Sequence, residues 1–221
     1  MHEQELRVRV GYQEDFSPFA ALGSGGPEGI AVDILSLTFG ELALEVEWVP
    51  LSLEHQISAL LQNDVDVLAC LGVTDQRKSQ VVFGEPIILT GGVLFRLLGA
   101  PVKNDRIVTP LRGPLVSSTK ETFPESSVVT VDGYPEALKS VFEGRADAAA
   151  LNIHVGRQMA ERELPGKFDS PGPVFKEISL APAWPPKHDV EFREAVNRIL
   201  VARGASELRT ELGRRLGADN R

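Results

Sequence analysis

The chain has 221 residues, of which 43% are hydrophobic and 24% charged, and its formal net charge is −8. This composition is typical of a globular protein with one large or two small domains, and it excludes a disordered chain. The acidic balance argues against nucleic-acid binding, which needs a basic surface. A single cysteine excludes an internal disulfide.

The charge is unevenly distributed along the chain. Residues 1–95 carry a net charge of −10 and residues 96–221 a net charge of +2. No apolar run reaches the ~18 residues that a membrane-spanning helix needs, and the first five residues lack the pattern of a signal peptide. We therefore expect either a cytoplasmic protein or an extracytoplasmic domain whose leader or anchor is absent from this chain.

Strands and helices are predicted to alternate along the first half of the chain. The pattern predicts a strand over 6–10, a polar-aromatic loop over 11–18, a turn over 23–27, a helix over 28–42, a strand over 44–49, a helix over 52–62, and strands over 65–70 and 91–98. The polar stretch over 101–105 interrupts this pattern, and we expect the chain to cross between two lobes there.

The alternation continues in the second half. It predicts strands over 107–109, 128–131 and 148–151, helices from 114, over 135–143 and over 154–163, an extended segment over 175–183, and one or two amphipathic helices over 190–216. The fold class that follows is α/β with mostly parallel sheets.

Two segments about eighty residues apart resemble each other. Residues 57–72 and 138–152 each predict the end of a helix, a stop, and a short apolar strand. Asn63 and Gly144 occupy the stops, and these residue types best tolerate a left-handed helix C-terminus. The echo predicts two similar lobes, each directing one loop towards a shared cleft beyond the carboxyl ends of its strands. An ordinary pair of unrelated αβ units is the alternative.

The first candidate site follows the strand that contains Ala69 and Cys70. Gly72 lets a ligand approach the backbone closely, and Thr74 is a predicted N-cap. Arg77 then lies in the first helical turn, where a guanidinium and free backbone N–H groups together favour an anion. The alternative is a surface arginine paired with Asp75 or Glu85. We interpret Cys70 as a small buried apolar residue.

The second lobe offers two further candidates. Gly113 and Pro114 predict a turn into a helix with proline at its first position, whose N–H groups would face the cleft. Asn152 follows an apolar strand and offers both a donor and an acceptor, although it would also serve as the cap of the next helix. The four histidines have no paired ligand spacing, so we expect no metal and no cofactor.

Several motifs resemble family 3 of the bacterial extracytoplasmic solute-binding proteins, which include the polar amino acid binders of ABC importers. The resemblance covers nearly the whole chain. It rests on Leu6-Arg-Val-Arg-Val-Gly11, Phe16-Ser-Pro-Phe19, Gly29-Ile-Ala-Val-Asp33, Leu60 to Asp66, Gly72-Val-Thr-Asp-Gln-Arg77, Phe83-Gly-Glu-Pro86 and Gly144-Arg-Ala-Asp-Ala148. It implies a type 2 periplasmic-binding fold that closes on a small ligand by hinge motion, with Arg77 on the ligand α-carboxylate and the Phe16 ring over the ligand.

The second lobe departs from the family in two places. The family usually has an aspartate at the position of Asn152, where it binds the ligand α-ammonium. Members that bind amino acids also tend to have threonine or serine after the glycine of the second lobe, where Pro114 and Leu115 stand here. Because an amide supplies no charge, we hypothesise that the ligand is not a standard zwitterion.

We therefore predict two lobes, 1–97 with 178–221 and 98–177, with a ligand cleft between them. The expected function is extracytoplasmic binding of a small carboxylate-bearing solute, an amino acid or a derivative, for ABC-type uptake. The alternatives are the Venus-flytrap sensing domain of a membrane receptor and, less favoured, a dehydratase-like periplasmic enzyme. We expect a monomer that binds no nucleic acid and partners a permease or its own receptor module. The predicted ligand contacts are Phe16, Ala69, Cys70, Gly72, Arg77, Gly113, Leu115 and Asn152.

Overall fold

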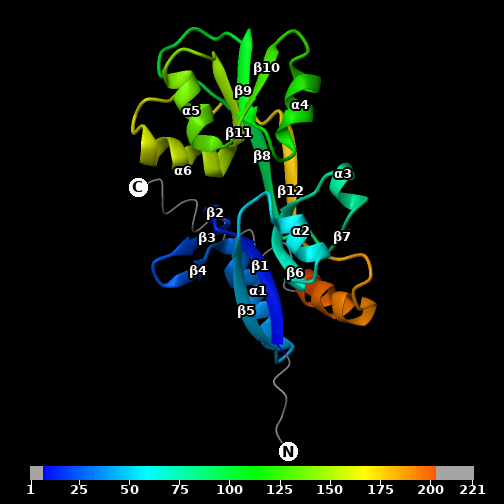
Figure 1. Cartoon of the computed structure of the whole chain (residues 1–221). Coiled ribbons are helices and arrows are strands. Elements are labelled where there is room, and N and C mark those ends of the chain that lie inside the picture. The colour runs from blue at the N-terminus through cyan, green and yellow to red at the C-terminus, as the bar shows by residue number, and fades with distance from the viewer. Residues whose placement is uncertain (1–6, 203–221) are drawn as a thin grey trace, which may run out of the picture. The chain divides into compact units, whose positions relative to one another are not determined.

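A computed structural model describes residues 7–202 of the chain (Figure 1). The chain divides into two compact units. Unit 1 comprises the described residues up to Ile88 and from Ser179 onwards, and unit 2 comprises Leu89–Ile178. The chain passes between the units in β8 (Ile88–Phe95) and returns in β12 (Lys176–Trp184).

The outward passage lies nine residues earlier than the predicted boundary after residue 97, whereas the return lies within one residue of the prediction. The polar stretch over 101–105 lies inside unit 2, in the loop between β8 and the next strand. The apolar strand β8 itself carries the chain from one unit into the other. A crossing inside an apolar strand cannot be recognised from the position of a polar stretch.

In unit 1, the sheet has the strand order β12-β6-β1-β5. Strand β1 (Arg7–Gln13) pairs in parallel with both β5 (Glu45–Leu51) and β6 (Val67–Gly72), and β12 pairs antiparallel with β6 and with β7 (Val82–Phe83). Every residue of β6 is buried, as expected for a central strand covered on both faces.

The predicted loop over 11–18 is wrong in its first half. Strand β1 continues to Gln13 because Gly11, Tyr12 and Gln13 pair with Val49, Pro50 and Leu51 of the neighbouring strand. The Tyr12 ring is buried and meets the Trp48 ring edge-on at 5.9 Å. A small separate sheet follows, made of β2 (Asp15–Phe16), β3 (Ala20–Gly23) and β4 (Gly26–Glu28), with the predicted glycine turn between its last two strands.

Four helical segments belong to unit 1: α1 (Ile30–Glu41), α2 (Gln56–Leu61), α3 (Asp75–Lys78) and residues 190–202. The last of these buries Val196 and Leu200, and its Phe192 ring stacks on Phe39 of α1 with centroids 6.3 Å apart. The prediction of a helical tail over 190–216 is confirmed up to residue 202, and its remainder lies outside the described residues.

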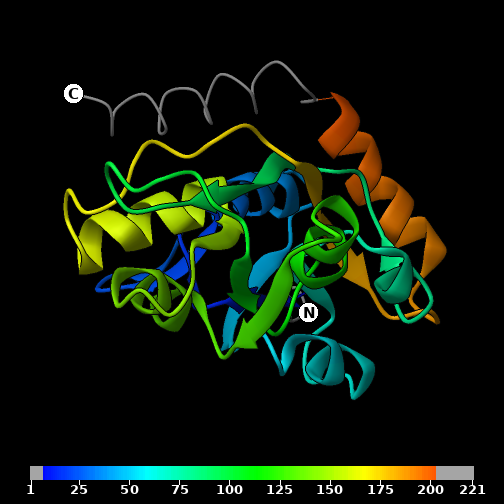
Figure 2. The same cartoon turned by 90° about the horizontal axis from the view of Figure 1, so that it is seen from above.

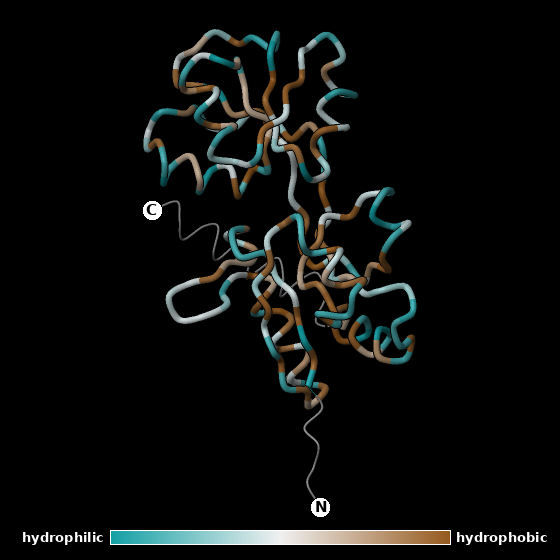
Figure 3. Tube along the Cα trace, viewed as in Figure 1, coloured by the Kyte–Doolittle hydropathy of each residue, from teal (hydrophilic) through white to brown (hydrophobic). Residues whose placement is uncertain are grey.

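In unit 2, the strand order is β10-β9-β11-β8. Strand β9 (Arg106–Pro110) pairs in parallel with β10 (Ser127–Val131) and β11 (Ala148–Asn152), and β11 pairs antiparallel with β8. Helices α5 (Tyr134–Phe142) and α6 (Ile153–Glu163) cover one side of these strands and α4 (Leu115–Thr122) the other (Figures 1 and 2). Hydrophobic residues follow the strands inside each unit (Figure 3).

The predicted echo between the two units is confirmed in the backbone. Asn63 and Gly144 adopt φ angles of 59° and 71°, which are left-handed. The residue after each stop donates its N–H five residues back, Asp64 to Ala59 at 2.9 Å and Arg145 to Ser140 at 2.8 Å. These bonds are those of a Schellman motif, so both helices end in the same way.

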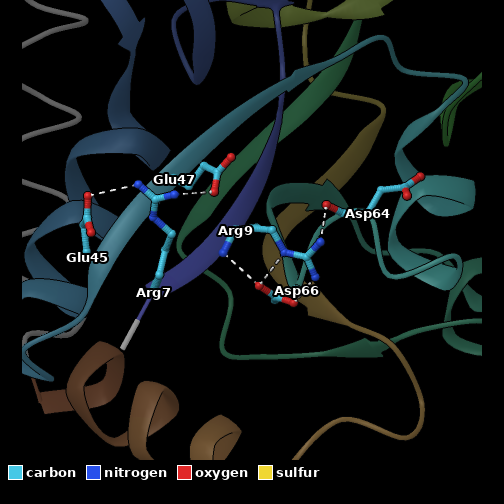
Figure 4. Close-up of polar contacts among 6 residues, drawn as sticks. All are labelled: Arg7, Arg9, Glu45, Glu47, Asp64 and Asp66. Atoms are coloured by element: carbon cyan, nitrogen blue, oxygen red, sulfur yellow. Dashed lines mark hydrogen bonds and ion pairs between the residues drawn. The ribbon is translucent and has the colours of Figure 1, made fainter. Parts of the chain in front are cut away.

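The aspartates that follow the two stops also play matching roles. Asp66 accepts a hydrogen bond from the backbone N–H of Arg9 at 2.8 Å, and Asp147 accepts one from the backbone N–H of Arg106 at 2.8 Å. Each arginine side chain donates to a carbonyl oxygen two residues before its aspartate. In unit 1 the Arg9 side chain also contacts Asp66, at 2.7 Å and 3.2 Å (Figure 4). Each aspartate thus fixes its helix-to-strand turn to a neighbouring strand of its own unit, which is β1 in unit 1 and β9 in unit 2.

Candidate functional site

The strongest candidate in unit 1 lies where β6 ends. Thr74 caps the short helix α3, because its hydroxyl accepts a hydrogen bond from the backbone N–H of Arg77 at 3.2 Å. The predicted N-cap is therefore confirmed. The Arg77 side chain turns back and donates from Nη1 to the carbonyl oxygen of Gly72 at 2.9 Å. The strand end, the cap and the guanidinium thus form one local unit.

Arg77 has no carboxylate within ion-pair distance among residues 7–202. Asp75, one of the two partners that the alternative interpretation offered, pairs instead with Lys78 at 3.0 Å. Burial lowers the pKa of the Arg77 guanidinium, which marks a site where a positive charge has lost part of its hydration. An arginine cannot release its proton in a protein, so an anion is the natural partner for its remaining N–H donors.

Ala69 and Cys70 lie in β6 with buried side chains. Burial raises the pKa of the Cys70 thiol, so this group stays protonated and is not a nucleophile. The interpretation of Cys70 as a small buried apolar residue agrees with this environment. In a strand with both faces covered, these two residues contribute side chains to the core, and only their backbone groups stay available for other contacts.

Phe16 lies in the small sheet of unit 1. Its ring contacts the Phe19 ring with centroids 5.2 Å apart, and its carbonyl oxygen accepts a hydrogen bond from the backbone N–H of Phe19 at 2.9 Å. Phe19 is fully buried, whereas Phe16 is half-buried. The buried ring therefore holds a second ring that keeps part of its surface available for an apolar group.

A polar chain at the end of β1 was missed in the sequence. Gln13 Nε2 donates to Asp15 Oδ1 at 2.9 Å, and Gln56 Nε2 donates to Gln13 Oε1 at 3.2 Å. Both glutamines are buried. Because β1 and β6 are parallel, this chain lies at the same carboxyl edge of the sheet as Gly72. A glutamine three residues after the alternating segment over 6–10 was the available signal.

In unit 2, the predicted turn at Gly113 and Pro114 follows β9. Gly113 adopts a φ of 112°, which only glycine accepts readily. Pro114 is the N-cap of α4 rather than its first residue, so the helix begins one residue later than predicted. The Leu115 side chain is buried and lies close to Gly92, where an added Cβ would come within 2.4 Å of it. The side chain of Leu115 thus belongs to the core of unit 2.

Asn152 ends β11 and caps α6. Its Oδ1 accepts hydrogen bonds from the backbone N–H groups of His154 at 3.0 Å and Val155 at 3.4 Å. The predicted cap is confirmed. The Thr90 hydroxyl of β8 is 3.3 Å from the same oxygen. Strands β9 and β11 are parallel, so the Gly113 turn and Asn152 lie at the same carboxyl edge of the unit 2 sheet.

Within the described part of the chain, no cluster of histidine, cysteine and carboxylate side chains could hold a metal ion. The described helices are also too short or too polar to cross a membrane. The candidate polar residues of both units lie instead at the carboxyl edges of the sheets, where ligands of α/β proteins bind.

Comparison with known proteins gives three findings. A sequence model of the bacterial extracellular solute-binding proteins, family 3, matches residues 8–215. The virulence sensor protein BvgS of Bordetella pertussis is 27% identical over 229 residues, which are 96% of this chain but 18% of that protein. The chain thus spans less than a fifth of the length of the curated sensor proteins it matches.

Solved structures share this fold, as two of them illustrate. The crystal structure of the periplasmic VFT2 domain of Bordetella pertussis BvgS has a TM-score of 0.84 at 22% identity, covering 94% of this chain and 92% of that one. An ancestral arginine-binding protein bound to glutamine has a TM-score of 0.78 at 21% identity, covering 95% and 96%. The predicted fold class, that of the type 2 periplasmic binding proteins, is confirmed.

Proposed function

Because this chain belongs to the bacterial extracellular solute-binding proteins, family 3, we propose that it binds a small carboxylate-bearing solute between its two units and closes on it by hinge motion. The observation that carries the proposal is Arg77. Its guanidinium is partly desolvated, is held by Gly72, and has no acid partner among the described residues. A carboxylate would supply the missing charge with bidentate hydrogen bonds.

The proposed site gives each unit a share of the ligand. In unit 1, Arg77 and the backbone after Gly72 would anchor the anion, and the half-buried Phe16 ring would cover an apolar part. In unit 2, the Gly113 turn and Asn152 would complete the contacts. Because the ligand would bind both units, it would favour the closed state by the free energy of the contacts that only that state provides.

We propose an extracytoplasmic location and a role in either sensing or uptake. The match to BvgS supports a sensing domain that passes ligand occupancy to its own receptor module. The family description and the likeness to an arginine-binding protein support uptake through an ABC permease. A full-length gene that encodes a transmembrane segment and a kinase favours sensing, and a leader peptide beside permease genes favours uptake. In both roles the chain binds its ligand without chemical conversion.

The test is a thermal-shift screen of protein stripped of bound ligand by partial unfolding and dialysis. The panel contains amino acids, their amides, and small mono- and dicarboxylates. A ligand at 100 times its Kd adds about 2.7 kcal/mol, which raises the Tm by roughly 5–10 °C for a chain of this size.

Arg77→Ala is the test variant and Lys78→Ala the matched control, since Lys78 lies in the same helix, is exposed, and pairs with Asp75. We expect a carboxylate to stabilise the wild type and Lys78→Ala but not Arg77→Ala. A shift that survives in Arg77→Ala, or no shift with any compound, contradicts the proposed function.

A further inference from the structure

The side-chain amide of Asn152 has a fixed orientation within unit 2. Its oxygen faces three donors: the backbone N–H groups of His154 and Val155 and the Thr90 hydroxyl. Turning the amide over would place its NH2 group against two N–H groups and remove the cap of α6. The oxygen therefore has to face the helix, and the NH2 group has to face the other way.

The NH2 group of Asn152 is the polar group that remains for a ligand. Asn152 is 3% exposed, and its Nδ2 has no hydrogen-bond partner among residues 7–202. Some side-chain nitrogen and oxygen atoms of the described chain are fully buried and lack a hydrogen-bond partner, but Nδ2 of Asn152 is not one of them. The small exposed surface of this residue therefore includes the NH2 group, which can donate but cannot accept.

The surroundings of Asn152 favour an acceptor over a cation. Its cross-strand partner is Gly92, and the space beside Gly92 is filled by the Leu115 side chain and the Phe175 ring. Burial, and then the positive charge of Arg157, lower the pKa of His154 in the first turn of α6. The helix N-terminus adds partial positive charge. An ammonium at this position would meet apolar groups, a donor and positive charge.

We propose that Asn152 makes unit 2 select ligands that present an oxygen acceptor and reject those that present an ammonium. This inference rests on the proposed function and specifies its ligand class: carboxylates that lack an α-ammonium group, with a carbonyl, hydroxyl or second carboxylate oxygen facing unit 2. An amino acid in the same site would leave its ammonium without an acceptor at Asn152 and would leave the Asn152 NH2 group without a partner.

The test uses matched pairs of compounds that differ only at the α-position, where the ammonium group is either absent or replaced by a hydroxyl: succinate and L-aspartate, glutarate and L-glutamate, 2-hydroxy-4-methylpentanoate and L-leucine, and 2-hydroxy-3-phenylpropanoate and L-phenylalanine. Calorimetry gives the Kd of each compound for the stripped wild type and for Asn152→Asp. The aspartate keeps the oxygen that caps α6, so the variant retains the helix start. Asn152→Ser, which also keeps a cap but loses the NH2 group, is the second variant, and circular dichroism checks that both variants fold.

We expect the wild type to bind the ammonium-free member of at least one pair at least about tenfold more tightly, as expected when a buried donor would otherwise lose its partner. Asn152→Asp should reverse this preference in favour of the amino acid and change the ratio of the two Kd values by at least about tenfold. Asn152→Ser should weaken the ammonium-free ligand without gaining the amino acid. The inference is overturned if the wild type prefers the amino acid, or if the ratio of the two Kd values is unchanged in Asn152→Asp. In either case the proposed function stands as long as binding depends on Arg77. No binding of any compound overturns both.

Discussion

Asp66 and Asp147 occupy matching positions in the two units, yet their removal should have unequal effects. We predict that Asp66→Ala destabilises the protein by about 2–3 kcal/mol and Asp147→Ala by about 1 kcal/mol. Both carboxylates accept a backbone N–H at 2.8 Å. Only Asp66 also contacts its arginine side chain, through Nη2 at 2.7 Å and Nε at 3.2 Å (Figure 4).

The magnitude follows from these contacts. A hydrogen bond to a charged acceptor contributes about 1.5–3 kcal/mol when it is shielded, and less when it is exposed. The bond to Asp147 is exposed, so its contribution falls below this range, at about 1 kcal/mol. The Arg9–Asp66 pair is about one third exposed on each side, so it adds no more than ~1 kcal/mol.

Urea unfolding followed by tryptophan fluorescence measures the difference. The chain has two tryptophans, Trp48 and Trp184, and both belong to unit 1 with Asp66. With a slope of about 2 kcal/mol per molar urea, Asp66→Ala should lower the midpoint by about 1 M, and by clearly more than Asp147→Ala. Equal shifts, or a shift below ~0.2 M for Asp66→Ala, would refute the argument from the extra arginine contacts.

Three further predictions concern stability and reactivity. Burial raises the pKa of Asp66, but hydrogen bonds from Arg9 outweigh it and the net pKa is lowered. The free energy of unfolding of the wild type should therefore exceed that of Asp66→Asn above pH ~4, and this difference should disappear as the pH falls further. Urea unfolding at several pH values measures it. Gly29→Ala should cost at least ~1 kcal/mol, because φ is 121° and the new Cβ would lie 2.6 Å from a backbone oxygen, whereas Gly25→Ala, in open space, should be neutral. The Cys70 thiol should react with a thiol reagent only in denaturant, and rapid labelling of native protein would contradict its burial.

The predictable features are those that a local pattern determines. Asn63 and Gly144 identified both helix ends because few residues accept the left-handed conformation. Thr74 identified the start of α3 because few residue types have a side chain that can accept a hydrogen bond from a backbone N–H of the first helical turn.

The features that escaped prediction depend on distant partners. Strand β1 reaches Gln13 because β5 pairs with it, and nothing in residues 11–13 specifies that pairing. Arg77 forms no ion pair with Asp75 because Asp75 pairs with Lys78, and the local sequence allows either pairing. The position of the first crossing lies within an apolar strand that continues unbroken from one unit to the other.

The central claim is that one small carboxylate contacts both units at the carboxyl edges of their sheets. The most direct measurement is a titration of stripped, 15N-labelled protein with the tightest-binding compound of the panel, followed by backbone amide NMR. The account predicts saturable shifts, with one common Kd, at Gly72 to Arg77 in unit 1 and at Gly113 to Leu115 and Asn152 to His154 in unit 2, excluding the proline. Shifts confined to one unit, or centred away from these segments, would contradict it.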